Sequence, residues 1–344
     1  MYKTEHQAVG YQPHWVREDF VDFIAEKVNP NWAWKKIKAE VIHIAEISSG
    51  FYQLHLRPNR NFNADHYQAG QSVLVTLVIE GVRHQRSYSI LEIMSNGDLS
   101  IAVKRQGRVS EALTRLARSA VVELSQSQGD FVLELAENSI LLIASGSGIT
   151  AIYALLNEAL SRQYRKIDLI YFSRDQAFHD QLSTLAQQHA QFNYVHIDTL
   201  QDRQHLSAAL LQRHVPDFKK RSAYVCGAQG MMRAAIDLYR ELGIEQQLKQ
   251  EFFQKYVDEQ LTAQPVVFAR SQQHFQASSN LLESAEQAGL RPSHGCRMGI
   301  CNRCSCTKVS GSTKNLVTGE IDHESQTQIK LCISQAVSPL VINL

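Results

Sequence analysis

Five of the six cysteines lie within the last 49 residues, and their spacing is the strongest chemical signal in the sequence. Three of them form a C-x4-C-x2-C run, and one more follows after 27 intervening residues; the four are Cys296, Cys301, Cys304 and Cys332. This is the plant-type spacing for a [2Fe–2S] cluster. A tight loop then supplies three thiolates and a distant segment supplies the fourth. The spacing therefore predicts an iron–sulfur site.

A zinc site is the main alternative, but structural zinc sites favour two pairs of closely spaced cysteines. Here three cysteines cluster and one is remote. Gly295 and Gly299 would let the loop backbone curl around a cluster and direct N–H groups toward its sulfur atoms. Cys306, on a predicted strand, is expected to be a buried apolar side chain. We therefore favour iron and sulfide over zinc.

A second motif is glycine-rich and lies in the middle of the chain. Gly146-Ser147-Gly148-Ile149-Thr150-Ala151 follows a predicted buried strand and precedes a predicted helix. That is the context in which glycines let the backbone approach a dinucleotide pyrophosphate. After the next predicted strand, Ser173 and Arg174 favour NADPH, since an arginine there accommodates the 2′-phosphate. Asp175 favours NADH instead, and Arg174 as a solvated strand-end charge is the plain alternative.

Two further motifs lie about 20 residues apart in the first third of the chain. Arg86-Ser87-Tyr88-Ser89 combines an arginine suited to a pyrophosphate with an aromatic ring and hydroxyls. Lys104-Arg105-Gln106-Gly107-Arg108-Val109-Ser110 opens a predicted helix, whose N-terminal N–H groups attract phosphate. Alone, the first motif could be a surface strand and the second an ordinary serine N-cap. Together they indicate a flavin, with FAD favoured over FMN.

These motifs occur together and in order, and through them residues 36–344 resemble ferredoxin–NADP reductase-type flavoproteins fused to a C-terminal plant-type ferredoxin domain. The resemblance implies that Arg86 to Ser89 and Lys104, with Gly107 to Ser110, hold the flavin. It implies equally that Gly146 to Thr150, with Ser173 and Arg174, hold the nicotinamide cofactor. Ser89 would then act at the flavin ring.

The same resemblance extends to two later segments. Cys226-Gly227-Ala228-Gln229-Gly230-Met231 matches the family's C-G-x-x-x-M pattern, which implies that Cys226 and Gly227 lie beside the nicotinamide. Glu251-Phe252-Phe253 would place an aromatic ring, Phe252 or Phe253, over the flavin. Cys226, Ser89 and Phe253 are thus the candidate catalytic residues. Plain packing in the core is the alternative for Cys226 and for both phenylalanines.

The pattern of elements predicts a multi-domain chain. Short alternating strands, including 72–79, 99–104 and 121–124, predict an antiparallel β-barrel for FAD over residues 36–137. Alternating strands and helices predict an α/β Rossmann-like NADP domain with a parallel sheet over residues 138–258. Residues 259–344 are expected to form an α+β β-grasp [2Fe–2S] ferredoxin domain, as the resemblance implies.

Residues 1–35 form an N-terminal extension with a short amphipathic stretch that ends before Pro30. The extension holds all three tryptophans, Trp15, Trp32 and Trp34. We expect the arm to pack on the barrel, and the functional alternative is that it docks the protein to a partner.

The length of 344 residues, the composition and the formal net charge of +1 are ordinary for a globular chain. They give no case for nucleic acid as a partner. No apolar run approaches the length of a membrane span, and no signal peptide is recognisable. The fourteen histidines show no metal-ligand spacing. We expect a cytoplasmic protein that would meet the inner membrane only through its partner.

Three cofactors in series would make the chain a converter that takes hydride from NADPH and releases electrons singly. The acceptor is expected to be a separate protein. Trp32, Trp34 and the residues around them are similar to reductases that serve membrane acyl-CoA Δ9 desaturases, which is the preferred partner. A soluble oxygenase or hydroxylase is the first alternative. A non-catalytic [2Fe–2S] carrier or redox sensor is the alternative from another class.

Overall fold

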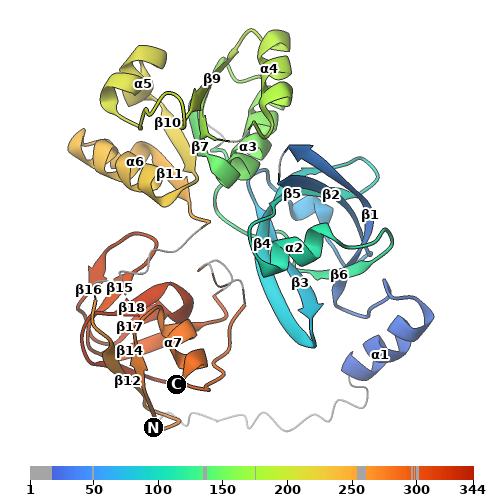
Figure 1. The fold of residues 1–344 in the computed structure, drawn as a ribbon, viewed down its shortest axis with the longest axis vertical. Coiled ribbons are helices and arrows are strands. Elements are labelled where there is room, and N and C mark those ends of the chain that lie inside the picture. Colours follow the sequence, from blue (N-terminus) through green and yellow to red (C-terminus); the bar gives the residue numbers. More distant parts are fainter. Residues whose placement is uncertain are drawn as a thin grey trace, which may run out of the picture.

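The computed structural model describes residues 18–344, except Ser49, 135–137, Asp175, 254–260, Cys296, Met298, Ile300 and Cys301. Three β-rich units follow one another along the chain, preceded by helix α1 (Glu18–Val28). Figure 1 shows the first unit beside the second, with the third below them. Two of the four predicted cluster cysteines, together with Trp15 and Asp175, therefore lie outside the described residues.

The first unit is a closed antiparallel barrel with strand order β1-β2-β5-β4-β3-β6. Its strands are β1 (Ile37–Ser48), β2 (Phe51–Pro58), β3 (Ser72–Ile79), β4 (Val82–Ile93), β5 (Leu99–Lys104) and β6 (Val121–Leu124). Alternate apolar side chains such as Val73, Val75 and Ile101 fill the interior, as the period-2 pattern predicts. The short helix α2 (Arg108–Thr114) lies against β3, β4 and β5.

The second unit is a parallel five-stranded sheet with order β11-β10-β7-β8-β9. The strands are β7 (Ser139–Ser145), β8 (Lys166–Ser173), β9 (Phe192–Asp198), β10 (Ser222–Cys226) and β11 (Leu248–Glu251). The helices are α3 (Ile149–Ser161), α4 (His179–Gln188), α5 (Ala208–His214) and α6 (Gln229–Glu241).

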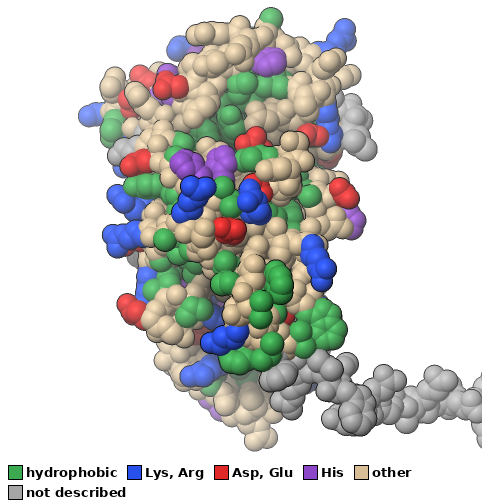
Figure 2. Space-filling view, turned by 90° about the vertical axis from the view of Figure 1, so that its right-hand side faces the viewer, with side chains coloured by type: hydrophobic (Ala, Val, Ile, Leu, Met, Phe, Trp, Pro, Cys, Tyr) green, Lys and Arg blue, Asp and Glu red, His purple; other side chains and the backbone are tan. Residues whose placement is uncertain are grey.

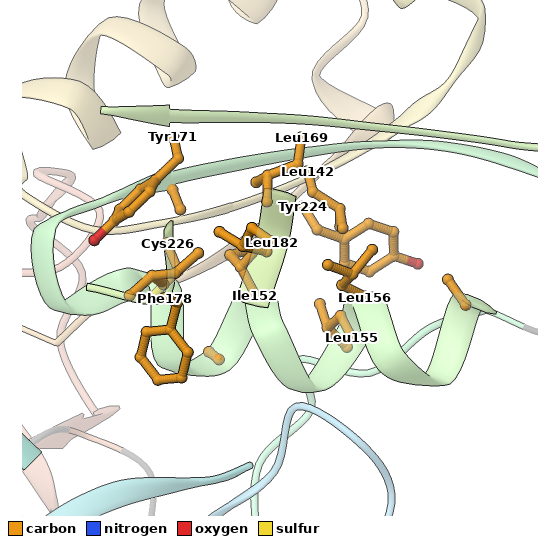
Figure 3. Packing of buried hydrophobic residues seen from close by; sticks show 14 of the residues in the cluster. Leu142, Ile152, Leu155, Leu156, Leu169, Tyr171, Phe178, Leu182, Tyr224 and Cys226 are labelled. Atoms are coloured by element: carbon orange, nitrogen blue, oxygen red, sulfur yellow. The ribbon is translucent and has the colours of Figure 1, made fainter. Parts of the chain in front are cut away.

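Two separate apolar cores show that helices cover both faces of this sheet, as predicted. On one face α3 and α4 pack on even-numbered residues of β7, and Figure 3 labels Leu142, Ile152 and Leu156 among the side chains of this core. On the other face α5 and α6 pack on Leu141 and Ile143 of the same strand. The strand order changes direction beside β7, where its neighbours are β8 and β10. Ligands bind at such switch points, beyond the carboxyl ends of the strands.

The third unit combines a five-stranded mixed sheet, order β13-β12-β19-β14-β17, with a three-stranded sheet, order β16-β15-β18. Its strands are β12 (Gln264–Phe268), β13 (Gln273–Ala277), β14 (Ser305–Ser310), β15 (Thr313–Asn315), β16 (Ile321–Asp322), β17 (Thr327–Lys330), β18 (Ser334–Ala336) and β19 (Leu340–Ile342). Helix α7 (Leu281–Gln287) packs on its core, which includes Cys304 and Cys332.

Short 3-10 helices connect these elements in the described part of the chain: η1 (Ala64–His66), η2 (Gly146–Gly148), η3 (Phe218–Lys220), η4 (Glu245–Gln247) and η5 (Leu331–Ile333). Among the residues that the structure describes, no helix is both long enough and apolar enough to span a bilayer.

Candidate functional site

One cavity of about 440 Å³ brings most of the predicted site residues together. It lies where the barrel meets the carboxyl edge of the parallel sheet. The predicted residues that line it are Arg86, Ser87, Tyr88, Ser89, Lys104, Gly107, Arg108, Val109, Ser110, Ser147, Thr150, Phe252 and Phe253. Four lining residues were not predicted: His84, Ala102, Gln106 and Glu251. Segments that are more than 160 residues apart in sequence therefore line the same cavity.

The barrel side of the cavity holds polar atoms without a protein partner. The Ser89 hydroxyl and Nε2 of His84 are buried and make no hydrogen bond to the protein. Such buried polar atoms are costly unless something else binds them. The Ser87 hydroxyl, in contrast, donates to the Ser72 hydroxyl at 2.8 Å. Burial raises the pKa of Tyr88 to about 12, so its phenol stays protonated. The orphaned Ser89 oxygen is what a flavin ring would satisfy.

Positive charge gathers at this side of the cavity. Burial lowers the pKa of His84, and the guanidinium groups of Arg108, Arg86 and Arg297 lower it further. Arg297 belongs to the predicted cluster loop of the third unit, so that loop contributes to the electrostatics of the cavity. Arg108 pairs with Glu80 and Arg297 with Glu286, whereas Arg86 lines the cavity, where it would favour a bound anion. The diphosphate of a dinucleotide has the charge that fits.

The turn before α2 is held by Ser110 in a way that the sequence did not anticipate. Gly107, not a serine, is the N-cap of α2. The Ser110 hydroxyl accepts hydrogen bonds from the backbone N–H groups of Gln106 at 3.1 Å and Gly107 at 3.0 Å. It also donates to the Gly107 carbonyl at 2.8 Å. Ser110 therefore shapes the turn that lines the cavity.

The glycine-rich turn after β7 is packed directly on the end of β10. A Cβ atom added at Gly148 would lie 2.1 Å from the carbonyl oxygen of Cys226. A Cβ atom at Gly227 would lie 2.2 Å from the Ser145 hydroxyl. That hydroxyl accepts a hydrogen bond from the Ala228 N–H at 2.6 Å. Only glycine permits this approach, which joins β7 and β10 at the switch point.

The other predicted residues of the glycine-rich turn, and Cys226, lie near this contact between β7 and β10. Gly146 has a φ of +51°, and its carbonyl accepts a hydrogen bond from the Tyr171 phenol at 3.2 Å. Ile149 is fully buried in the core below. Cys226 is also fully buried, and burial raises the pKa of its thiol well above the ordinary value. Cys226 is thus held as a neutral thiol behind the cavity.

Ser173 and Arg174 lie at the carboxyl end of β8, outside the residues that line the cavity. The Ser173 hydroxyl is 2.9 Å from Nε2 of His196 on the neighbouring strand β9. Arg174 is exposed. This edge of the sheet is where a bound dinucleotide would extend beyond the turn at Gly146.

Glu251, at the end of β11, is the main site residue that the motifs did not predict. As a whole residue it is half-buried, yet its Oε2 atom is buried without a partner. Burial raises the pKa of this carboxyl to about 8, and Glu251 in turn contributes to raising the pKa of Cys226. A carboxyl that is largely protonated near neutral pH can hold or give a proton beside the cavity.

Glu251 and Phe252 also line a second cavity, of about 620 Å³, on the other side of the same segment. That cavity is lined in addition by Gly299, Asn302 and Ile333 of the third unit. The end of β11 therefore lines both cavities, and described residues of the predicted cluster loop line the second.

The predicted cluster loop itself is partly described. Cys304 and Cys332 are both buried, and the Leu331 N–H donates to the Cys304 carbonyl at 3.1 Å. A Cβ atom at Gly299 would lie 2.7 Å from Cδ1 of Ile333, the residue after Cys332. The loop and the fourth cysteine are thus adjacent. The described residues hold no cluster of metal-ligating side chains, and Cys296 and Cys301 lie outside them.

The backbone of this loop is unusual for its residue types. Arg297 and Asn302 have φ values of +60° and +57°, and Gly299 has +81°. Left-handed conformations are uncommon for residues other than glycine and cluster where a loop must curl tightly. Cys306, in contrast, lies on β14 with its thiol buried, and burial raises its pKa to about 12. It fits the expected packing role.

Comparison with known proteins identifies the first two units. Residues 38–166 match the oxidoreductase FAD-binding domain, and residues 142–237 match the oxidoreductase NAD-binding domain. The chain is 28% identical over 332 residues to "NADPH oxidoreductase" of Mycobacterium tuberculosis, covering 92% of this chain and 86% of that protein. It is also 28% identical over 264 residues to the ferredoxin reductase component of 3-ketosteroid-9-alpha-monooxygenase from the same species, covering 70% and 73%.

Among solved structures, phthalate dioxygenase reductase has a similar fold, with a TM-score of 0.64 at 23% identity. The match covers 90% of this chain and 98% of that one, which is described as a modular structure for electron transfer from pyridine nucleotides to [2Fe–2S]. The chain therefore carries an oxidoreductase FAD-binding domain and an oxidoreductase NAD-binding domain. It is an oxidoreductase, and the predictions of an antiparallel barrel followed by an α/β nucleotide-binding domain are confirmed.

Proposed function

We propose that this chain passes electrons from NADPH through FAD to a [2Fe–2S] cluster, and from there to a separate protein. The observation that carries the proposal is the shared wall at Glu251 and Phe252. The cavity on one side of this segment is lined by the flavin and nicotinamide motifs, and the cavity on the other side by the predicted cluster loop.

The proposed roles follow from the positions of the side chains. Ser89 would bind the flavin ring through its orphaned hydroxyl, and Tyr88 would cover one face. Arg86 and the turn at Gly107 would hold the diphosphate. FAD would accept hydride from the nicotinamide and release single electrons. Phe253, which also lines the cavity, would give way to the nicotinamide when it binds.

The nicotinamide cofactor would lie along the carboxyl edge of the parallel sheet. Its diphosphate would meet the turn Gly146–Gly148, and its reactive ring would approach Cys226. NADPH is favoured because Ser173 and Arg174 stand where a 2′-phosphate would lie. The name of the Mycobacterium tuberculosis relative, "NADPH oxidoreductase", supports this preference.

For residues 259–344 we propose a ferredoxin domain, with 36–137 and 138–258 as the flavin and nicotinamide domains. Three observations support the cluster: the spacing of the four cysteines, the adjacency of Cys304 and Cys332, and the left-handed turns at Arg297 and Asn302. The similarity to phthalate dioxygenase reductase extends over 90% of the chain, so it reaches this unit as well.

The electron acceptor is proposed to be a membrane acyl-CoA desaturase, on the sequence similarity around Trp32 and Trp34. A second candidate is an oxygenase. It is favoured by relatives whose names describe reductase components of 3-ketosteroid-9-alpha-monooxygenase and of carnitine monooxygenase. Turnover of each class of acceptor, reconstituted with this reductase and NADPH, would distinguish them.

The cofactor content tests the proposal. Protein purified without oxygen is expected to contain one FAD, two irons and two acid-labile sulfides per chain, roughly, as a [2Fe–2S] flavoprotein should. FMN in place of FAD would correct the flavin assignment only. One zinc with no sulfide would refute the cluster.

A further inference from the structure

His84 lines the first cavity but has no role in the proposed function. Its Nε2 atom is buried and has no hydrogen-bond partner among the described residues. A buried polar atom without a partner costs free energy, so such an atom in the wall of a cavity indicates a ligand that would bind it. The residues around His84 indicate which part of a ligand that would be.

Strand β4 places three cavity residues in a row. Tyr88, Arg86 and His84 follow one another at intervals of two residues, so their side chains share one face of the strand. Antiparallel pairing with β3 fixes the register, with His84 opposite Leu77. Four residues at about 3.3 Å each place His84 roughly 13 Å from Tyr88 along the strand. The row therefore continues past Arg86, away from the position proposed for the flavin ring.

Two of the arginines near His84 already have carboxylate partners. Arg108 of α2 forms an ion pair with Glu80, in the hairpin between β3 and β4. Arg297 of the third unit forms an ion pair with Glu286 of α7. These contacts leave His84 as a wall residue whose buried nitrogen is free to bind a ligand.

The chemistry of His84 suits a hydrogen bond to phosphate. Burial lowers the pKa of the imidazole, and the neighbouring arginines lower it further, so the ring is neutral near neutral pH. A neutral imidazole carries one N–H, and a phosphate oxygen beside Nε2 would select the tautomer in which Nε2 donates. Figure 2 views the right-hand side of Figure 1, where Lys and Arg side chains are dispersed among acidic and apolar ones. In the cavity, by contrast, Arg86 and His84 lie in one row.

We propose that His84 donates a hydrogen bond to the adenylate phosphate of FAD and thereby makes the site selective for FAD over FMN. The inference rests on the proposed function. A five-carbon ribityl chain separates the flavin ring from its first phosphate. With the ring at Ser89 and the first phosphate at Arg86, the second phosphate extends toward His84. FMN ends at the first phosphate and would not reach this residue.

The affinities for the two flavins test the inference, since FAD differs from FMN only by its adenylate half. The full chain, depleted of flavin, is titrated with FAD and separately with FMN, and the change in flavin fluorescence reports binding. His84→Ala should weaken FAD binding roughly tenfold or more, as for the loss of a hydrogen bond to a charged group, and leave FMN binding within about twofold of the parent's.

Two further variants serve as matched controls. His84→Gln keeps an N–H donor at the end of the side chain and should recover most of the FAD affinity. His43→Ala changes an exposed histidine on β1 of the same barrel and should bind both flavins as the parent does. The melting temperature of the flavin-free protein should be unchanged in the His84 variants, because Nε2 has no hydrogen bond to the described residues.

Unchanged FAD affinity in His84→Ala would overturn the inference. An equal loss of FAD and FMN affinity would overturn it as well, because His84 would then act on the ring or the first phosphate. A parent that binds FMN as tightly as FAD would show that the adenylate half is not recognised, while the proposed electron transfer would stand, since either flavin supplies that chemistry. A parent that binds neither flavin would refute the proposed function and this inference with it.

Discussion

The two halves of the central cavity are built in opposite ways. On the nicotinamide side, backbone packs on backbone: Gly148 touches the end of β10, and an added Cβ would lie 2.1 Å from a carbonyl oxygen. On the flavin side, Gly107 has extended backbone with a φ of −178°, and nothing lies within 4 Å of an added Cβ. The first glycine is required by the protein itself, whereas the second leaves room for something that binds.

The largest effect is therefore expected at Gly148. Gly148→Ala forces a methyl group into the backbone of Cys226, which cannot move without separating β7 from β10. Overpacking of this kind costs about 1–3 kcal/mol. We expect a clearly lowered melting temperature together with poor NADPH binding. A variant with unchanged melting temperature would show that the two strands tolerate separation and that the packing account is wrong.

A substitution at Arg174 tests the nicotinamide side at the carboxyl end of β8, beyond the turn Gly146–Gly148. Loss of a charge-assisted contact to phosphate costs about 1.5–3 kcal/mol. Arg174→Ala should therefore raise KM for NADPH roughly ten- to hundredfold and leave KM for NADH almost unchanged. Arg213→Ala, at an exposed arginine on α5, is the control. Equal effects on both cofactors would remove Arg174 from the recognition of the 2′-phosphate.

Gly107 sharpens the contrast with Gly148 because the same substitution should act on the ligand alone. Gly107→Ala should keep the free energy of unfolding of the flavin-free protein within about 0.5 kcal/mol of the parent's, as for an unstrained surface position. Its affinity for FAD should fall roughly tenfold, about 1.4 kcal/mol, since the backbone could no longer approach the phosphate as closely. Unchanged FAD affinity would mean that this turn does not contact the cofactor.

Glu251, which lines both cavities, gives an effect that depends on pH. Its pKa is about 8 in the folded protein and near 4.5 when unfolded, so the folded state binds the extra proton between these values. Stability should consequently fall as the pH rises from about 4.5 to about 8. In Glu251→Gln, the fall in melting temperature over this pH range should be smaller than in the parent by a few degrees. An unchanged slope would show that the carboxyl is ionised and solvated.

Regular elements were predictable because their patterns are local. Strands 72–79, 99–104 and 121–124 were predicted residue for residue, since alternation and turn signals bound them. Strand β11 was missed because Leu248–Glu251 is short and mostly polar; parallel pairing with β10 fixes it instead. The third unit's strands of two or three residues carry no usable period, and tertiary pairing alone defines them.

For the site, motifs predicted which residues would meet but not the contacts that hold them. The role of Glu251 depends on burial against two cavities, and nothing in its neighbouring sequence encodes that. Ser110 was predicted near phosphate, whereas its hydroxyl is occupied in shaping the turn. The backbone on either side of Trp32 is likewise held by asparagines more than twenty residues away.

The central claim is that electrons leave the flavin through the cluster, and rapid-mixing kinetics of Cys301→Ser beside Cys306→Ser test it most directly. Cys306 is buried on β14 and outside the predicted ligand set, so its variant is the matched control. The Cys301 variant should lack iron and sulfide, keep NADPH reduction of its flavin at the parent rate, and lose cytochrome c reduction. The Cys306 variant should keep all three. Undiminished cytochrome c reduction by a Cys301 variant that lacks the cluster would contradict the account.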